Sequence, residues 1–195
     1  MQDSLHYTAI VAAALVLAAC AAPGDAFAPR AAMSSDRVAA PSAQAVQVTG
    51  GGTGTFGADL DGDGHVDGSH FGFTVVIAGD GSAQGHFTCL MAGNTKFLGL
   101  HLMAVQGPVT SGALDGRRFT GTATVKVLNA FGPGVQSIFR DIPFVVAVTP
   151  GGPGVGTMQL TVMGVFDGVP GDVVPGNGNY DLPRETLTTG QIRIH

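Results

Sequence analysis

From residue 45 to residue 195, apolar and polar residues alternate over most of the chain. Because successive side chains of a β-strand point to opposite faces, this period of two predicts strands with one apolar face each. Glycine-rich segments interrupt the alternation, and they are the expected positions of turns. The pattern predicts about eight strands and no helix, namely 45–49, the two arms of a hairpin over 70–92, 97–106, 117–128, 142–149, 157–163 and 188–195.

The hairpin over residues 70–92 has a register that its hydrophobic pattern selects. A three-residue turn, Gly79-Asp80-Gly81, pairs Ala78 with Ser82, whereas a two-residue turn would bury a histidine and expose a phenylalanine. The longer turn is therefore predicted. It places Ala83, Gly85, Phe87 and Cys89 on the apolar face and sends His86 and Thr88 outward.

Antiparallel strands with one apolar face must either close on themselves or pack as two sheets to hide that face. We therefore expect one all-β domain, a β-sandwich or a flattened β-barrel, and periodicity does not distinguish the two. Pro143 predicts that the strand over 142–149 begins beside it, because proline in sheets is confined to first residues, edges or bulges.

The N-terminal segment has the features of a bacterial export signal. An apolar run from Ala9 to Ala19 is too short to span a bilayer and ends in Leu17-Ala18-Ala19-Cys20, which resembles a lipobox. This resemblance implies a signal peptide over 1–19 and a lipid on Cys20 that anchors the protein in the bacterial cell envelope. Cleavage after Ala26-Phe27-Ala28 is the alternative and would give a secreted or periplasmic protein.

Residues 20–44 are rich in Ala, Pro and Ser and lack any strand or helix periodicity, so a disordered tether is expected before the domain over 45–195. The net charge of −5 gives no basic footprint for nucleic acid. If Cys20 carries a lipid, Cys89 is the one thiol left, and we expect it to be a buried apolar residue.

Asp-Gly repeats in the segment DLDGDGHVDG, residues 59–68, suggest a calcium loop. Asp59, Asp61 and Asp63 occupy positions 1, 3 and 5 of an EF-hand-like pattern, with Asp67 at position 9. His70 stands where an EF-hand has glutamate, so further oxygens would have to come from water or from Asp167, Asp172 and Asp181. The alternative is that the Asp-Gly pairs only form turns.

A second polar loop, residues 166–185, is long for a structureless connection. Its polar groups and one aromatic could contact a carbohydrate or an envelope protein, and the candidates are Asp167, Asp172, Tyr180 and Asp181. Its prolines favour the alternative of a rigid Ω-type loop packed by its own side chains.

Several segments resemble the glycine-rich secreted bacterial β-domains called post-COAP domains. They are TGGG at 49–52, FGF at 71–73, VFDGVPGD at 165–172, Tyr180 and GQIRIH at 190–195. The resemblance implies an exported β-domain and no particular reaction.

No catalytic motif is found in the chain. Glu185 is the single glutamate, and no serine lies in a nucleophile elbow. The sequence thus predicts a non-enzymatic, lipid-anchored binding, adhesion or structural module of the outer membrane or cell surface. The alternative is a lipocalin-like barrel that carries a small hydrophobic ligand, which would require a cavity of roughly 300 Å³ or more.

Overall fold

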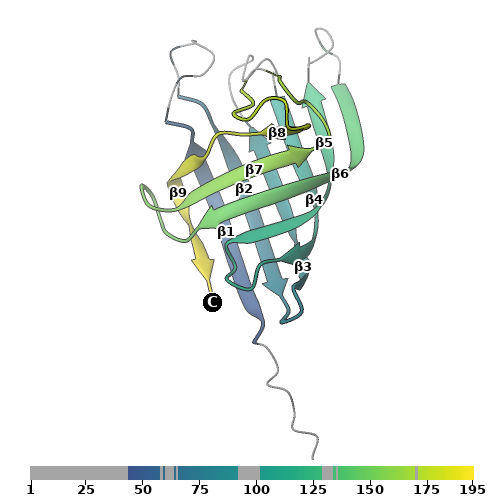
Figure 1. The fold of residues 1–195 in the computed structure, drawn as a ribbon. Helices are drawn as coiled ribbons and strands as arrows, with labels where there is room; N and C mark the ends of the chain where they lie inside the picture. Colours follow the sequence, from purple (N-terminus) through teal and green to yellow (C-terminus); the bar gives the residue numbers. More distant parts are fainter. Residues whose placement is uncertain are drawn as a thin grey trace, which may run out of the picture. The chain divides into compact units, whose positions relative to one another are not determined.

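The computed structural model describes residues 44–57, 59, 64, 66–91, 102–128, 134, 136–169 and 171–195. The described residues form nine antiparallel strands and no helix, so the predicted all-β class is confirmed (Figure 1). The strands are β1 (Val46–Thr55), β2 (Gly68–Ile77), β3 (Ser82–Met91), β4 (Leu102–Gly112), β5 (Arg118–Leu128), β6 (Gln136–Thr149), β7 (Thr157–Met163), β8 (Asn179–Asp181) and β9 (Glu185–Ile194).

The strands close into a barrel. Neighbouring strands pair in chain order from β1 to β6, β6 pairs with β7, β7 pairs with β9, and β9 pairs back with β1. Each strand of this ring therefore has a partner on both sides. Between the two architectures that the sequence left open, the pairing selects the closed barrel.

The short strand β8 continues the pairing of β9 with β7 and is not a separate strand of the barrel. Tyr180 pairs with Val162, and the Leu182 amide donates to the Leu160 carbonyl at 3.0 Å. Three residues later Glu185 pairs with Met158, which shifts the register by one position. The ring thus contains eight strand positions, in agreement with the predicted number.

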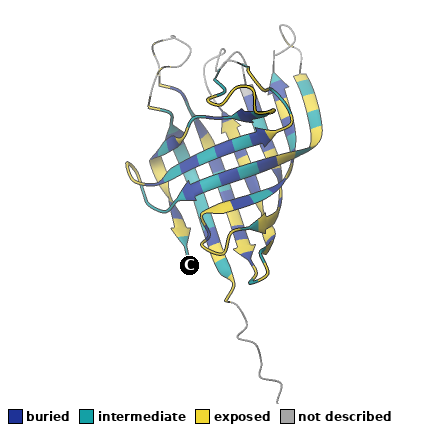
Figure 2. Ribbon diagram, in the orientation of Figure 1, coloured by how far each residue is buried: buried dark blue, intermediate teal, exposed yellow. Residues whose placement is uncertain are grey.

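The barrel interior is filled by apolar side chains. Buried and exposed residues alternate along the strands (Figure 2). At the centre, the ring centroid of Phe73 lies 5.1 Å from that of Phe119, and Phe87 lies 5.3 Å from Phe144. Gly50 is needed beside this cluster, because a Cβ atom there would overlap the ring of Phe73.

Two connections close the ends of the barrel. The turn between β4 and β5 brings Gly116 beneath the interior, where an added Cβ would lie 2.8 to 3.0 Å from Ile194, Val46 and Val48. Toward the other end, the segment after β7 packs Val165, Phe166 and Val169 against the core. The core is therefore covered by local loops as well as by strands.

The predicted hairpin register is confirmed. Ala78 donates its amide to the Ser82 carbonyl at 2.8 Å, and Phe73 pairs with Phe87. His86 is exposed, as expected. The prediction that Gly85 is buried is wrong, since it is exposed, and the pairing of β3 with β4 shifts register between Ser82 and Gly85. Gly85 also lies so close to β2 that a Cβ atom would strike the Thr74 carbonyl.

The predicted start of the strand at Pro143 is wrong, because β6 begins at Gln136. Ala123 pairs with Ile142 and Val125 with Phe139, so two residues of β6 lie opposite one residue of β5. This β-bulge precedes Pro143 and accommodates it inside the strand. The part of the predicted strand 97–106 before residue 102 lies outside the described residues.

Candidate functional site

The Asp-rich loop joins β1 to β2. The ladder extends one pair beyond the strands, since the Phe56 amide donates to the Asp67 carbonyl at 2.9 Å. The Gly64 amide donates to Oδ2 of Asp59 at 2.8 Å, so this carboxylate caps its own loop. Asp67 is only 4% exposed.

Asp61 and Asp63 of the predicted calcium loop lie outside the described residues, as do Leu17 and Cys20 of the lipobox. Within the described ranges, no group of three or more His, Cys, Asp or Glu side chains is arranged to hold a metal ion. Calcium binding by Asp59, Asp61, Asp63 and Asp67 stays a prediction. No helix among the described residues is long and apolar enough to cross a membrane.

Asp167 and Asp172 of the second loop are acceptors for the loop's own backbone. Asp167 accepts from the amides of Gly176 and Gly178, at 2.6 and 3.0 Å. Asp172 accepts from the amides of Gly168, Val174 and Asp181, at 2.9 to 3.3 Å. These bonds organise the loop from within, which supports the Ω-type alternative.

The pKa of Asp172 reflects these contacts. Burial acts to raise it, but the hydrogen bonds from the three backbone amides, together with a side-chain hydrogen bond with Asp167, outweigh burial and hold the pKa below its ordinary value. The charged carboxylate is thus the form that stabilises the loop.

Asp181 and Tyr180 also have structural partners. The Asp181 carboxylate accepts from Oγ1 of Thr161 at 2.6 Å and from Nδ2 of Asn177 at 2.7 Å. Tyr180 is 0% exposed and meets Phe166 edge-on at 6.2 Å. The predicted surface aromatic therefore faces the core, because β8 pairs with β7 and turns this side chain inward.

The sole glutamate of the chain is buried inside the barrel, which no pattern in the sequence predicts. Glu185 is 1% exposed, and both of its carboxylate oxygens accept from the Ser69 hydroxyl, at 2.8 and 2.7 Å. Burial raises the pKa of Glu185 to about 7, while the hydrogen bonds from Ser69 act in the opposite direction. The carboxyl group therefore titrates near neutral pH.

Cys89 completes this interior cluster. Burial, reinforced by the nearby Glu185 charge, raises the pKa of its thiol, and the hydrogen bond with Ser69 opposes the shift only in part. The expectation of a buried, apolar cysteine is confirmed. Because all three side chains are shielded from solvent, the cluster is a core feature and offers no open nucleophile.

The outer face of the barrel carries hollows lined by described residues. One of about 220 Å³ lies near Arg118 and Asp181, so opposite charges face each other there. Another, of about 240 Å³, lies around Val76 and Gln84 and has no charged lining residue. The largest of the three has a volume of about 500 Å³ and crosses β3, β4, β5 and β6. We call it the outer groove; its lining residues are His86, Ala104, Gln106, Gly107, Pro108, Thr124, Lys126, Ile138 and Arg140.

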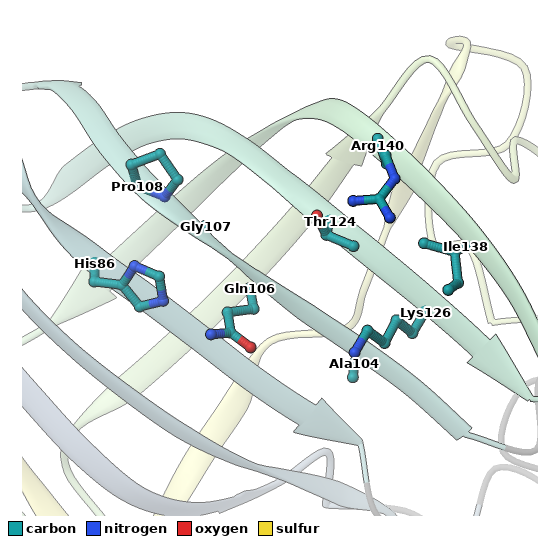
Figure 3. A pocket seen from close by; sticks show the side chains of 9 residues that line it. All are labelled: His86, Ala104, Gln106, Gly107, Pro108, Thr124, Lys126, Ile138 and Arg140. Atoms are coloured by element: carbon teal, nitrogen blue, oxygen red, sulfur yellow. The ribbon is translucent and has the colours of Figure 1, made fainter. Parts of the chain in front are cut away.

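The outer groove is lined by small, apolar and polar residues (Figure 3). Ala104 and Gly107 of β4 add little side-chain bulk, whereas the flanking strands contribute longer side chains. Lys126 and Arg140 come from β5 and β6, and His86 stands at the β3 side. Among the described residues that line the groove there is no carboxylate, so its cations face no opposing charge from them.

The β-bulge in β6 positions one of these cations. Asp141 adopts φ 57°, in the left-handed region that non-glycine residues seldom occupy. This extra residue lets Arg140 remain on the outward face between Ile138 and Pro143. Bulges commonly re-aim a side chain in this way. The alternation of apolar and polar residues could not predict the groove. The outward position of Arg140 depends on the β-bulge in β6, which only the pairing of the strands reveals.

A scan against protein-family models and searches of curated proteins and of solved structures find no match for this chain.

Proposed function

We propose that the protein is a non-catalytic binding module of the bacterial envelope, anchored by a lipid on Cys20, that meets its ligand on the outside of a solid barrel. The filled interior carries this proposal. A ligand carrier needs an internal cavity of roughly 300 Å³ or more, but phenylalanine rings occupy the centre of this barrel. The volume needed for a ligand is present instead in the outer groove.

Two inward positions of β5, Gly121 and Ala123, carry small residues. A Cβ atom at Gly121 would lie 3.0 Å from the ring of Phe144. Ala123 is likewise buried among the core residues. Small residues therefore accommodate large rings here, and the space above them is already taken.

A hydrophobic fluorescent probe tests the solid interior. The full-length protein should show no saturable uptake of a fluorescent fatty acid, whereas a Phe87→Ala variant, whose cavity lies inside the barrel, is expected to gain some. Saturable uptake by the unaltered protein with micromolar affinity would favour the carrier.

Membrane fractionation tests the anchor. We predict that Cys20→Ser moves the protein from the membrane pellet to the soluble fraction, because a lipid contributes about 0.8 kcal/mol for each buried CH₂ group. Cys89→Ser is the matched control and should stay in the pellet. A Cys20→Ser protein that still requires detergent for extraction would refute the lipid anchor.

Calcium binding by the loop of Asp59, Asp61, Asp63 and Asp67 is part of the proposal, as a stabilising ion of the extracellular type. At a Kd of roughly 0.1 to 1 mM, 1 mM calcium would stabilise the domain by about 0.4 to 1.4 kcal/mol. Melting curves with and without calcium should therefore differ, and Asp61→Ala/Asp63→Ala should abolish the difference. An equal shift in that variant would exclude the loop as the site.

A further inference from the structure

The outer groove carries two positive side chains, Lys126 and Arg140, that have no partner among the described residues. Neither Lys126 nor Arg140 forms an ion pair or a hydrogen bond with another described residue. By contrast, the net charge of the whole chain is −5. The two cations therefore make a hollow of about 500 Å³ locally positive on a protein whose overall charge is negative.

We propose that the outer groove binds an acidic oligosaccharide, whose carboxylate groups contact Arg140 and Lys126. This inference rests on the proposed binding function and names its ligand. Arginine presents a planar set of donors that matches a carboxylate in two parallel hydrogen bonds, and lysine adds a second, flexible charge.

The neutral part of the groove suits sugar hydroxyl groups. Gln106 and Thr124 pair across β4 and β5, so an amide and a hydroxyl lie side by side between the cations and His86 (Figure 3). Both groups can donate and accept, as sugar hydroxyls do. Pro108 and Ile138, which is 47% exposed, offer apolar surface to the C–H faces of the rings.

The dimensions of the groove fit a short chain. It crosses four adjacent strands, and three strand spacings of about 4.8 Å amount to roughly 14 Å. A trisaccharide has a similar length. The ligand would lie across the strands, with its acidic groups toward β5 and β6.

An acidic peptide is a weaker match for this surface. Extended peptides commonly bind by adding a strand to an open sheet edge. Here β3, β4, β5 and β6 each pair with a strand on both sides, so the groove offers no backbone edge. Recognition must therefore come from side chains alone.

Isothermal titration of the detergent-solubilised full-length protein with trigalacturonate tests the proposal. Binding is expected in low salt and should weaken several-fold when salt is raised from 50 to 500 mM, because screening reduces exposed charge contacts. Maltotriose, a neutral trisaccharide, should bind at least about tenfold more weakly, since it lacks the charge-assisted hydrogen bonds.

Two double variants with the same loss of charge locate the site. Arg140→Ala/Lys126→Ala should weaken trigalacturonate binding by at least about tenfold. Arg184→Ala/Arg193→Ala removes two cations from outside the groove and should leave binding within about twofold. Arg140→Lys, which keeps the charge, should lose part of the affinity because the paired hydrogen bonds are lost.

Several results would overturn the assignment. They are no detectable binding at 10 mM trigalacturonate, equal binding by both double variants, and equal or tighter binding of maltotriose or of an oligoglutamate peptide. Tighter oligoglutamate binding that depends on Arg140 would replace the ligand class yet leave the binding function intact. Uptake of a fatty acid into the barrel would instead contradict the proposed function, so the two failures are distinguishable.

Discussion

The loop over residues 166–185 and the outer groove both carry charged groups at the surface, but these groups have different partners. In the loop, the carboxylates of Asp167, Asp172 and Asp181 each accept two or three hydrogen bonds from their own surroundings. In the groove, Lys126 and Arg140 have no such contacts with the described residues. The aspartates are occupied by hydrogen bonds within the protein, whereas the cations are available to bind a ligand.

The number of internal hydrogen bonds separates charges that stabilise the fold from charges that are available for binding. A charged group that accepts hydrogen bonds from several backbone amides contributes to stability, and its removal leaves those amides without an internal acceptor. An exposed charge without partners contributes little to stability. Stability measurements and binding measurements should therefore respond to different residues of this protein.

The buried Glu185 should affect stability more than either of these charged regions, and its effect should depend on pH. Its pKa is about 7 in the folded protein against 4.5 for an ordinary glutamate. The folded state holds the proton on Glu185 more tightly than the unfolded state does, so this group contributes to the free energy of unfolding. The contribution is complete below about pH 4.5 and is lost as pH rises through about 7. The loss is on the order of 3 kcal/mol in the free energy of unfolding.

Urea unfolding between pH 5 and pH 8 measures this slope. Glu185→Gln keeps a polar side chain of similar shape but does not titrate, so its stability should vary much less over the same range. An unchanged slope in this variant would show that another group is responsible.

Asp172→Ala should give the next largest effect, a loss of about 2 kcal/mol in the free energy of unfolding, because three backbone amides lose their acceptor. Asp115→Ala is a suitable control, since that carboxylate caps a single amide, that of Arg117, in an exposed turn. Equal losses in the two variants would mean that the loop does not depend on its internal acceptor. The lowered pKa of Asp172 adds that the loop should weaken as pH falls through that pKa.

Removing the two cations of the outer groove should change stability least. Arg140→Ala/Lys126→Ala should change the free energy of unfolding by less than about 0.5 kcal/mol, as is usual for exposed side chains without fixed partners. Thermal melts of this variant and of Arg184→Ala/Arg193→Ala should nearly coincide. A loss of 2 kcal/mol would place the groove cations among the structural charges.

Much of the fold could be predicted because one physical rule governs most of it. The inward positions from Phe119 to Val127 are all buried, as the alternation indicates, and the turn at Asp80 fixes the hairpin register. The start of β6 could not be predicted, since Pro143 suggested a strand end while the β-bulge allows the strand to continue.

The candidate site was less accessible to sequence reasoning. Asp167, Asp172 and Asp181 were visible as a polar cluster, but their hydrogen-bond partners depend on how the loop folds back. Glu185 had no pattern around it that predicted burial. The outer groove draws residues from β3, β4, β5 and β6, so it arises only when the strands are in register.

The pairing of β1 with β9 has a consequence for how the chain reaches its native state. Thr53 contacts Thr189, 136 positions further along the chain. During synthesis the ring can therefore close only after β9 has been made. Contacts between residues so distant in sequence also make folding slow. During that interval β1 and β7 present unpaired backbone edges, which are templates for aggregation. The yield of folded protein will therefore depend on how quickly β9 pairs with β1.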